Sequence, residues 1–137
     1  MWEVNDMSYN KYKNVKTEKD GYKFDSKLEE SYYENLLDLK DKGIVESFEM
    51  QVPYLLQEAF VNNNNERIRK IEYKADFVVN YEDGHQEVID IKPASLQMIR
   101  PEFKLKRKLL MYKYPEINFK CISRRGRKPN YEWFQIL

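Results

Sequence analysis

The chain has 137 residues, of which 42% are hydrophobic and 34% are charged. This length fits one domain, and the composition is typical of a globular protein with its own hydrophobic core. No stretch is apolar enough to cross a bilayer or to form a secretory signal, which predicts a cytoplasmic protein without a membrane partner. The single cysteine, Cys121, and the single histidine, His85, exclude an intrachain disulfide and the cysteine-based or two-histidine types of zinc site.

The net charge of +1 conceals two charged blocks of opposite sign. Residues 25–49 hold eight acidic residues against three lysines, whereas residues 100–128 hold eleven Lys or Arg against two acidic residues. A basic surface attracts the phosphate backbone of nucleic acids, and clustered carboxylates bind hard cations. Two ordinary solvated faces would give the same pattern, so composition leaves both interpretations open.

The first predicted elements are an arm, a helix and a long extended segment. Residues 1–21 are polar and lack periodicity, which predicts an N-terminal arm ahead of a single domain at residues 22–137. From Ser26 to Lys42 apolar residues recur at helical spacing, with a capping box of Ser26 and Glu29 at the start and Gly43 at the end. Residues 44–57 are predicted to be extended, and the asparagine-rich segment 61–67 is predicted to be a loop.

A hairpin, a second helix and two further strands complete the prediction. Residues 69–81 and 86–92 form the hairpin strands around Asp83-Gly84, a typical turn sequence. A helix is expected from Pro101 to about Lys113, then a strand at 117–122, a basic loop at 123–130 and a short strand at 131–137. This order predicts an α/β fold with a mixed sheet flanked by helices, in which the strand after the second helix pairs in parallel with the hairpin.

The predicted hairpin carries two carboxylates among apolar residues, Asp76 on its first strand and Asp90 on its second. A buried carboxylate is unfavourable unless it is paired or binds a cation, and a divalent metal would relieve the repulsion between two of them. Lys92 shares a face with Asp90, because side chains two residues apart on a strand point the same way. A cation held by oxygen ligands beside a lysine, with Mg²⁺ as the natural candidate, suits phosphodiester hydrolysis.

Simpler explanations exist for each of these residues. An Asp-x-Lys sequence is common and usually marks a solvated strand edge, although the hairpin and the second aspartate favour a metal site here. The capping box alone is sufficient to explain Glu29. His85 is expected to be a solvated turn residue, and Cys121 a core residue.

The two half-motifs resemble the PD-(D/E)XK nuclease superfamily, which places an aspartate on one strand and an acid-x-Lys on the next. Here they are the KAD that ends at Asp76 and the DIK from Asp90 to Lys92. Within the superfamily the chain resembles the Holliday-junction-resolving endonuclease I of phages and other small phage nucleases. The likeness spans roughly residues 22–123, including FDSKLEESYYENLLDLKDKGI, FEMQVPYLL and PEFKLKRKLLMYKYPEINFKCI.

The resemblance implies a restriction-endonuclease-like α-β-β-β-α-β core and a Mg²⁺- or Mn²⁺-dependent endonuclease that cuts DNA. It implies that Asp76, Asp90 and the Ile91 carbonyl bind the metal. It also implies that Glu29 is the helix-borne acid, which contributes to metal binding, and that Lys92 positions the attacking water. The implied substrate is branched duplex DNA such as a four-way junction, and the implied context is phage recombination or DNA processing.

Two positions depart from the superfamily pattern. Ala75 precedes Asp76 where the motif name has Pro, and Pro93 follows Lys92 where Gly is usual. Because Pro93 has no backbone N–H and a fixed φ, its presence bears on the substrate geometry more than on the chemistry.

Further DNA contacts are predicted from position and charge. Gln51 is expected either to contact a phosphate or water at the site or to be an ordinary sheet residue. Lys104 and Lys108 lie one helical turn apart and suit a phosphate backbone, and the basic loop would extend that surface through Arg124, Arg125, Arg127 and Lys128.

The partners and the alternatives follow from this interpretation. Symmetric cutting of two strands predicts a homodimer, to which the N-terminal arm would contribute. The alternatives are a duplex- or flap-cutting nuclease of the restriction type, a catalytically inert DNA-binding protein of the same fold, and a structural protein with a basic face.

Overall fold

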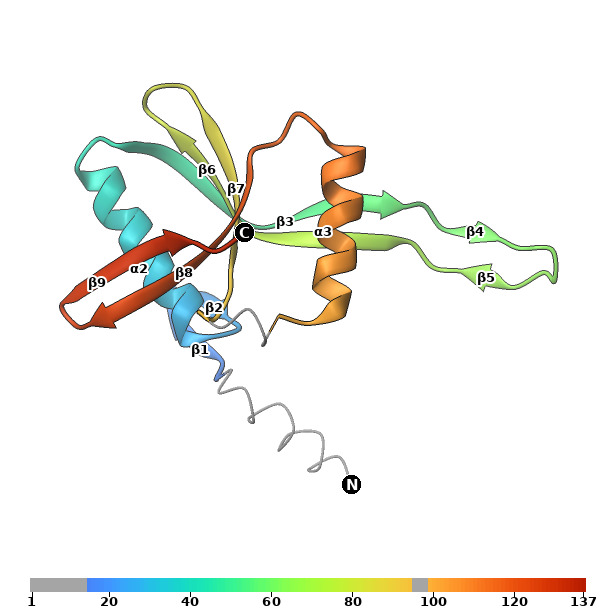
Figure 1. Cartoon of the computed structure of the whole chain (residues 1–137), viewed down its shortest axis with the longest axis horizontal. Helices are drawn as coiled ribbons and strands as arrows, with labels where there is room; N and C mark the ends of the chain where they lie inside the picture. The colour runs from blue at the N-terminus through green and yellow to red at the C-terminus, as the bar shows by residue number, and fades with distance from the viewer. Residues whose placement is uncertain (1–14, 95–98) are drawn as a thin grey trace.

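A five-stranded sheet lies between two helices in the computed structural model, which describes residues 15–94 and 99–137 (Figure 1). The helices among these residues are α2 (Lys27–Asp41) and α3 (Pro101–Lys113). The sheet strands are β3 (Val45–Gln57), β6 (Ile71–Tyr81), β7 (Gln86–Ile91), β8 (Phe119–Arg127) and β9 (Asn130–Gln135). Two short ribbons accompany the sheet: β1 (Thr17–Lys19) with β2 (Tyr22–Phe24), and β4 (Phe60–Val61) with β5 (Arg67–Ile68).

The strands follow the order β3-β6-β7-β8-β9. Neighbours pair antiparallel except β7 and β8, which pair in parallel after the crossover through α3. The chain order α2-β3-β6-β7-α3-β8 confirms the predicted α-β-β-β-α-β core with a mixed sheet.

Helix α2 begins and ends at the predicted signals. The hydroxyl of its N-cap, Ser26, accepts a hydrogen bond from the Glu29 backbone N–H at 3.1 Å. At the other end Gly43 adopts a φ of 77°, which suits glycine, and the Ile44 N–H donates to the Leu39 carbonyl at 2.9 Å. The helix therefore ends where the left-handed conformation of Gly43 allows the next backbone N–H group to bond to one of the last helical carbonyls.

Two hydrophobic clusters hold the helices to opposite faces of the sheet, and the successive residues Phe77, Val78 and Val79 of β6 alternate between them. The cluster beneath α2 contains the buried residues Phe24, Tyr32, Tyr33, Leu36, Val45, Phe77, Val79, Ile89 and Ile91. The cluster beneath α3 contains Tyr73, Ala75, Val78, Val88, Ile99, Phe103, Leu110 and Cys121. Cys121 is thus a core residue, as expected.

One of the two predicted loops is confirmed in the structure and the other is wrong. Residues 62–66 of the loop predicted at 61–67 form the turn between β4 and β5, a ribbon that extends away from the sheet beyond β3 and β6 (Figure 1). The predicted basic loop at 123–130 is wrong, because residues 123–127 belong to β8 and pair with β9. The charged side chains of this strand made its sequence resemble a loop. They are tolerated because the β8–β9 hairpin forms the edge of the sheet.

The predicted arm lies partly outside the described residues. Residues 1–14 are not described, and Thr17–Lys19 forms β1, which pairs with β2. Over the described residues, neither helix has the length and apolar character needed to cross a bilayer.

Candidate active site

Asp76 and Asp90 lie where strands β6 and β7 separate. Moving away from the turn, the last residues of these strands that pair are Phe77 and Ile89, which are adjacent in sequence to the two aspartates. The carboxylate of Asp76 then accepts a hydrogen bond from the Ile91 backbone N–H, at 2.8 Å from Oδ2. Strand β7 continues beside β8 through Asp90 and Ile91. At this fork the Asp76 side chain, and not a backbone carbonyl of β6, accepts the hydrogen bond from Ile91. The fork therefore brings the two predicted carboxylates to one place.

Asp90 is held from two sides. It is 3% exposed, and the Tyr73 hydroxyl donates a hydrogen bond to Oδ1 at 2.6 Å. Lys92 Nζ lies 3.0 Å from Oδ2 as an ion pair. Apart from this ion pair, Oδ2 is buried without a hydrogen-bond partner in the part of the chain that the structure describes. Tyr73 was missed by sequence reasoning, because its contact with Asp90 joins different strands and follows no local motif.

Lys92 is fixed between an acid and an aromatic ring. Its ammonium group lies 4.2 Å from the centre of the Phe103 ring, the distance of a cation–π contact. Burial opposes its charge, but the attraction of Asp90 and Asp76 raises the pKa of Lys92 above its usual value. The side chain is therefore a charged donor held beside the carboxylates.

Glu29 joins this region from the first turn of α2. The N-cap hydrogen bond uses its backbone N–H, whereas its buried carboxylate lies along the same cleft as Asp76. Burial, followed by repulsion from Asp25 and Asp90, raises the pKa of Glu29 to about 7. Burial, followed by repulsion from Asp90 and Glu29, raises the pKa of Asp76 well above its usual value. The N-cap hydrogen bond therefore involves the backbone of Glu29, while its side chain lines the cleft.

The carboxylates line a cleft of about 770 Å³ that basic side chains also line. Its acidic lining residues are Asp25, Glu29, Asp76, Asp90 and Glu102. Its basic lining residues are Lys16, Lys27, Lys74, Lys92, Arg100 and Lys106. This mixed lining suits a phosphodiester, because basic side chains can bind the DNA backbone and carboxylates can hold a metal at the reacting phosphate. The sequence analysis identified Glu29, Asp76, Asp90 and Lys92 but missed the other charged lining residues, which come from segments far apart in the chain.

Gln51 faces the same site from β3. The pairing of β3 with β6 runs from Met50 opposite Phe77 to Val52 opposite Ala75, which places Gln51 opposite Asp76. Its φ of 54° is left-handed, a conformation that non-glycine residues seldom adopt and that often marks functional sites. It lines the cleft, as the first of its two predicted alternatives requires.

The other predicted DNA contacts lie outside the cleft. Lys104 and Lys108 are exposed on α3, whereas Lys106 lines the cleft. The four basic residues of the predicted loop belong to the β8–β9 hairpin instead: Arg124, Arg125, Arg127 and Lys128.

Two of those arginines have partners within the protein. Arg124 donates to the Ser31 hydroxyl at 2.6 Å and lies 3.7 Å from the Tyr131 ring centre. Arg125 forms two hydrogen bonds with the Glu132 carboxylate. His85 lies in the β6–β7 turn, stacked on Tyr81, away from the cleft.

The donor set of the cleft fits Mg²⁺ or Mn²⁺. Among the described residues no three acidic, His or Cys side chains form a ready-made metal cluster. Mg²⁺ does not need one, because it is usually held by one or two carboxylates and retains several waters. Asp90 is buried and Asp76 is half-buried, and both offer carboxylate oxygens. The Oδ2 atom of Asp90 has the ammonium group of Lys92 as its partner and no other hydrogen bond among the described residues. A divalent cation would compensate the charge that burial makes unfavourable here.

The fold and the cleft define a mixed α/β domain with buried carboxylates at a strand fork. The chain belongs to the family described as "Protein of unknown function (DUF1064)", whose model matches residues 9–130. That match includes both helices and strands β1 to β8. A search of curated proteins found no match.

Proposed function

We propose that this protein is a Mg²⁺- or Mn²⁺-dependent endodeoxyribonuclease that hydrolyses phosphodiester bonds. The observation that carries the proposal is the meeting of Asp76, Asp90 and Lys92 at one strand fork, inside a cleft that further basic side chains line. A binding protein has little reason to bury acids where a phosphate would lie, since the acids repel it. Those acids therefore favour catalysis over inert DNA binding.

Each residue has a role that its surroundings support. Asp76 and Asp90 would hold the metal, with Glu29 and the Ile91 carbonyl nearby as further oxygen donors. The bound cation would supply positive charge to the phosphate and activate water. Lys92, fixed by Asp90 and by an aromatic ring, would orient that water and stabilise charge that develops on the phosphate. The basic residues that line the cleft would hold the DNA backbone in register.

Branched DNA is the proposed substrate, and a homodimer is the proposed assembly. Both rest on the resemblance to junction-resolving endonucleases and on the need to cut two strands symmetrically. The cytoplasm, of a bacterial host if the protein is encoded by a phage or prophage, is the proposed location.

Cleavage of end-labelled DNA tests the proposal. A synthetic four-way junction and a linear duplex of the same sequences are incubated with the protein in Mg²⁺ or in EDTA. Asp90→Asn is the test variant. Asp83→Asn, in the exposed turn between β6 and β7, is the matched control. Cutting that needs both the metal and Asp90, but not Asp83, is expected.

The outcomes separate the alternatives. Preferential cutting of the junction supports a resolvase, whereas equal cutting of both substrates supports the duplex-cutting alternative. Binding without cutting would overturn the nuclease and support an inert DNA-binding protein. Absence of both binding and cutting would leave a structural role for the basic face.

A further inference from the structure

We propose that an aromatic pocket beside the carboxylates holds an unstacked nucleobase of the DNA strand that is cut. The proposal rests on the proposed function and names the feature of the substrate that this pocket selects. The pocket has a volume of about 420 Å³ and lies between β2, the first turn of α2, β3 and β6. Its aromatic lining residues are Tyr22, Phe24, Phe48 and Phe77.

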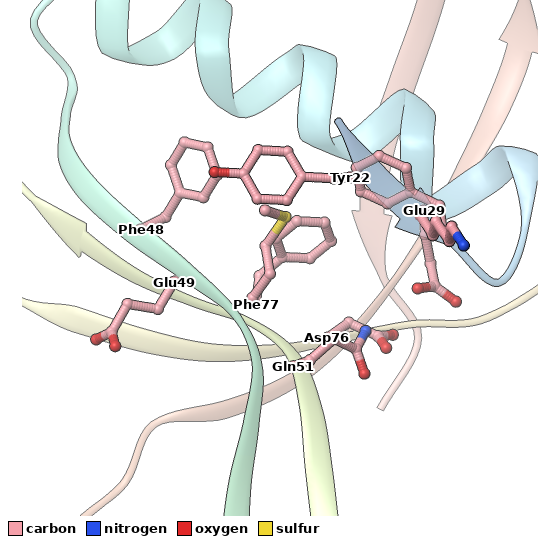
Figure 2. Close-up of a pocket in the computed structure, with 10 residues that line it drawn as sticks. Tyr22, Glu29, Phe48, Glu49, Gln51, Asp76 and Phe77 are labelled. Carbon is pink, nitrogen blue, oxygen red and sulfur yellow. The ribbon is translucent and has the colours of Figure 1, made fainter. Parts of the chain in front are cut away.

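The pocket and the catalytic cleft share a boundary. Glu29, Gln51 and Asp76 line both of them. Figure 2 shows the rings of Tyr22, Phe48 and Phe77 on one side of the pocket, and the polar ends of the three shared residues on the other. A nucleotide with its phosphate at the carboxylates would therefore have this pocket beside it for its base.

Aromatic packing holds an accessible ring at this pocket. Tyr22 is 49% exposed, yet its ring centre lies 5.7 Å from that of Tyr33, which also contacts Phe48 at 5.9 Å. The Tyr33 hydroxyl donates to Asp20 Oδ2 at 2.9 Å and so fixes the turn between β1 and β2. Nucleobases stack on such pre-positioned aromatic rings whatever their sequence.

The polar boundary favours a base over other occupants. The amide of Gln51 offers a donor and an acceptor, which suit the edge of an unpaired base. A phosphate inside the pocket is disfavoured, because the carboxylates of Glu29, Glu49 and Asp76 outnumber the one basic lining residue, Lys23, and repel an anion that no metal bridges to them. A base within a duplex is stacked and paired, so it would have to leave the helix before entering. The pocket therefore selects DNA with an unpaired or extruded base next to the scissile phosphate, as at junctions and flaps.

A coupling experiment tests this assignment without depending on cleavage. Branched DNA is prepared intact and with single abasic sites at successive positions around the junction. Affinities are measured by fluorescence anisotropy in Ca²⁺. The full-length wild type is compared with Tyr22→Ala and Tyr22→Phe. Tyr112→Ala, which removes an exposed aromatic ring from α3, is the matched control.

One abasic position is expected to weaken wild-type binding roughly tenfold, because a stacked base is lost. The same abasic site should have no further effect on Tyr22→Ala, while Tyr22→Phe and Tyr112→Ala keep the wild-type difference. Equal abasic effects in wild type and Tyr22→Ala would overturn the pocket assignment. Displacement of the DNA by free deoxynucleoside monophosphates at micromolar concentration would also overturn it, in favour of a free nucleotide.

The two proposals fail in different ways. Metal-dependent cleavage without this coupling would leave the nuclease and remove the pocket from substrate recognition. Coupling without cleavage would retain the base pocket and make the protein a binder of branched DNA.

Discussion

The Tyr73 hydroxyl donates a hydrogen bond to Asp90 Oδ1 across strands β6 and β7, with 2.6 Å between the oxygens. Both groups are buried, so neither water nor an alternative donor readily replaces the bond. Tyr73 therefore fixes the orientation in which Asp90 presents its second oxygen to Lys92 and to the cleft.

Tyr73→Phe is expected to destabilise the protein by about 1.5–3 kcal/mol, because a buried carboxylate loses a charge-assisted hydrogen bond. The Mg²⁺ concentration for half-maximal cleavage should also rise, since Asp90 loses its orientation. Urea unfolding and a Mg²⁺ titration measure the two effects. Tyr114→Phe is the control, because that hydroxyl donates to the neutral Leu55 carbonyl at 2.9 Å. An unchanged Mg²⁺ dependence in Tyr73→Phe would argue against the positioning role.

Much of the fold was predictable from local signals. Helix α2 begins at Ser26 and ends at Gly43 because a hydroxyl and a left-handed glycine satisfy its terminal backbone groups. The β6–β7 hairpin follows from its turn sequence. Strand β8 was only half predicted, because its outer part carries the charges of a sheet edge and resembles a loop. Its pairing with β9 is a tertiary fact that no local pattern contains.

The candidate site divides in the same way. Asp76, Asp90 and Lys92 stand out because acids and a lysine interrupt apolar strands. Tyr73 and the cleft lysines do not stand out, since an aromatic residue on a strand and a lysine on a surface are ordinary. Their roles arise only when the sheet brings distant segments together. For the same reason the helical spacing of Lys104 and Lys108 indicated a shared face but not which face borders the cleft.

Asp76→Asn separates the proposed role of this residue in metal binding from its structural hydrogen bond. The amide oxygen still accepts from the Ile91 N–H, while the unfavourable buried charge is removed. In EDTA at pH 8 the variant is expected to be at least as stable as the wild type. Millimolar Mg²⁺ should raise the melting temperature of the wild type but not of the variant. An equal Mg²⁺ shift in both proteins, measured by differential scanning fluorimetry, would exclude Asp76 as a ligand.

The stability of the metal-free protein should fall as the pH rises from about 4.5 to about 7. The pKa of Glu29 is about 7 in the folded state against 4.5 ordinarily, so the folded state binds the extra proton in this window. Its contribution is fully present below the unfolded pKa and is lost as pH rises through the folded pKa, a loss on the order of 3 kcal/mol.

Glu29→Gln should reduce the slope of this part of the pH profile, because the amide does not titrate. Part of the slope should remain, since the pKa of Asp76 is also raised in the folded state. Glu46→Gln, at an exposed glutamate of β3, is the control and should keep the wild-type slope. Chemical unfolding in EDTA at several pH values measures the effect, and an unchanged slope in Glu29→Gln would show that other groups cause it.

Lys92→Met tests the proposed role of the ammonium group. Methionine keeps an apolar stem to pack on Phe103 but cannot orient water or stabilise charge. Cleavage is expected to fall about 100-fold or more while DNA affinity changes little, because the effect is on the transition state. Lys120→Met is the control, since Lys120 is ion-paired with Glu87 outside the cleft. Single-turnover rates with saturating protein would contradict the role if both variants lost equal activity.

The positions of two α3 lysines relative to the cleft predict different contributions to DNA binding. Lys106 lines the cleft, whereas the exposed Lys104 does not. If Lys106 neutralises a phosphate, Lys106→Ala should reduce the slope of log affinity against log salt by about 0.9, and Lys104→Ala should reduce it less. Anisotropy titrations of junction DNA in Ca²⁺, over a series of NaCl concentrations, give both slopes. The opposite order would mean that DNA follows the outer face of α3 and reaches the carboxylates by another path.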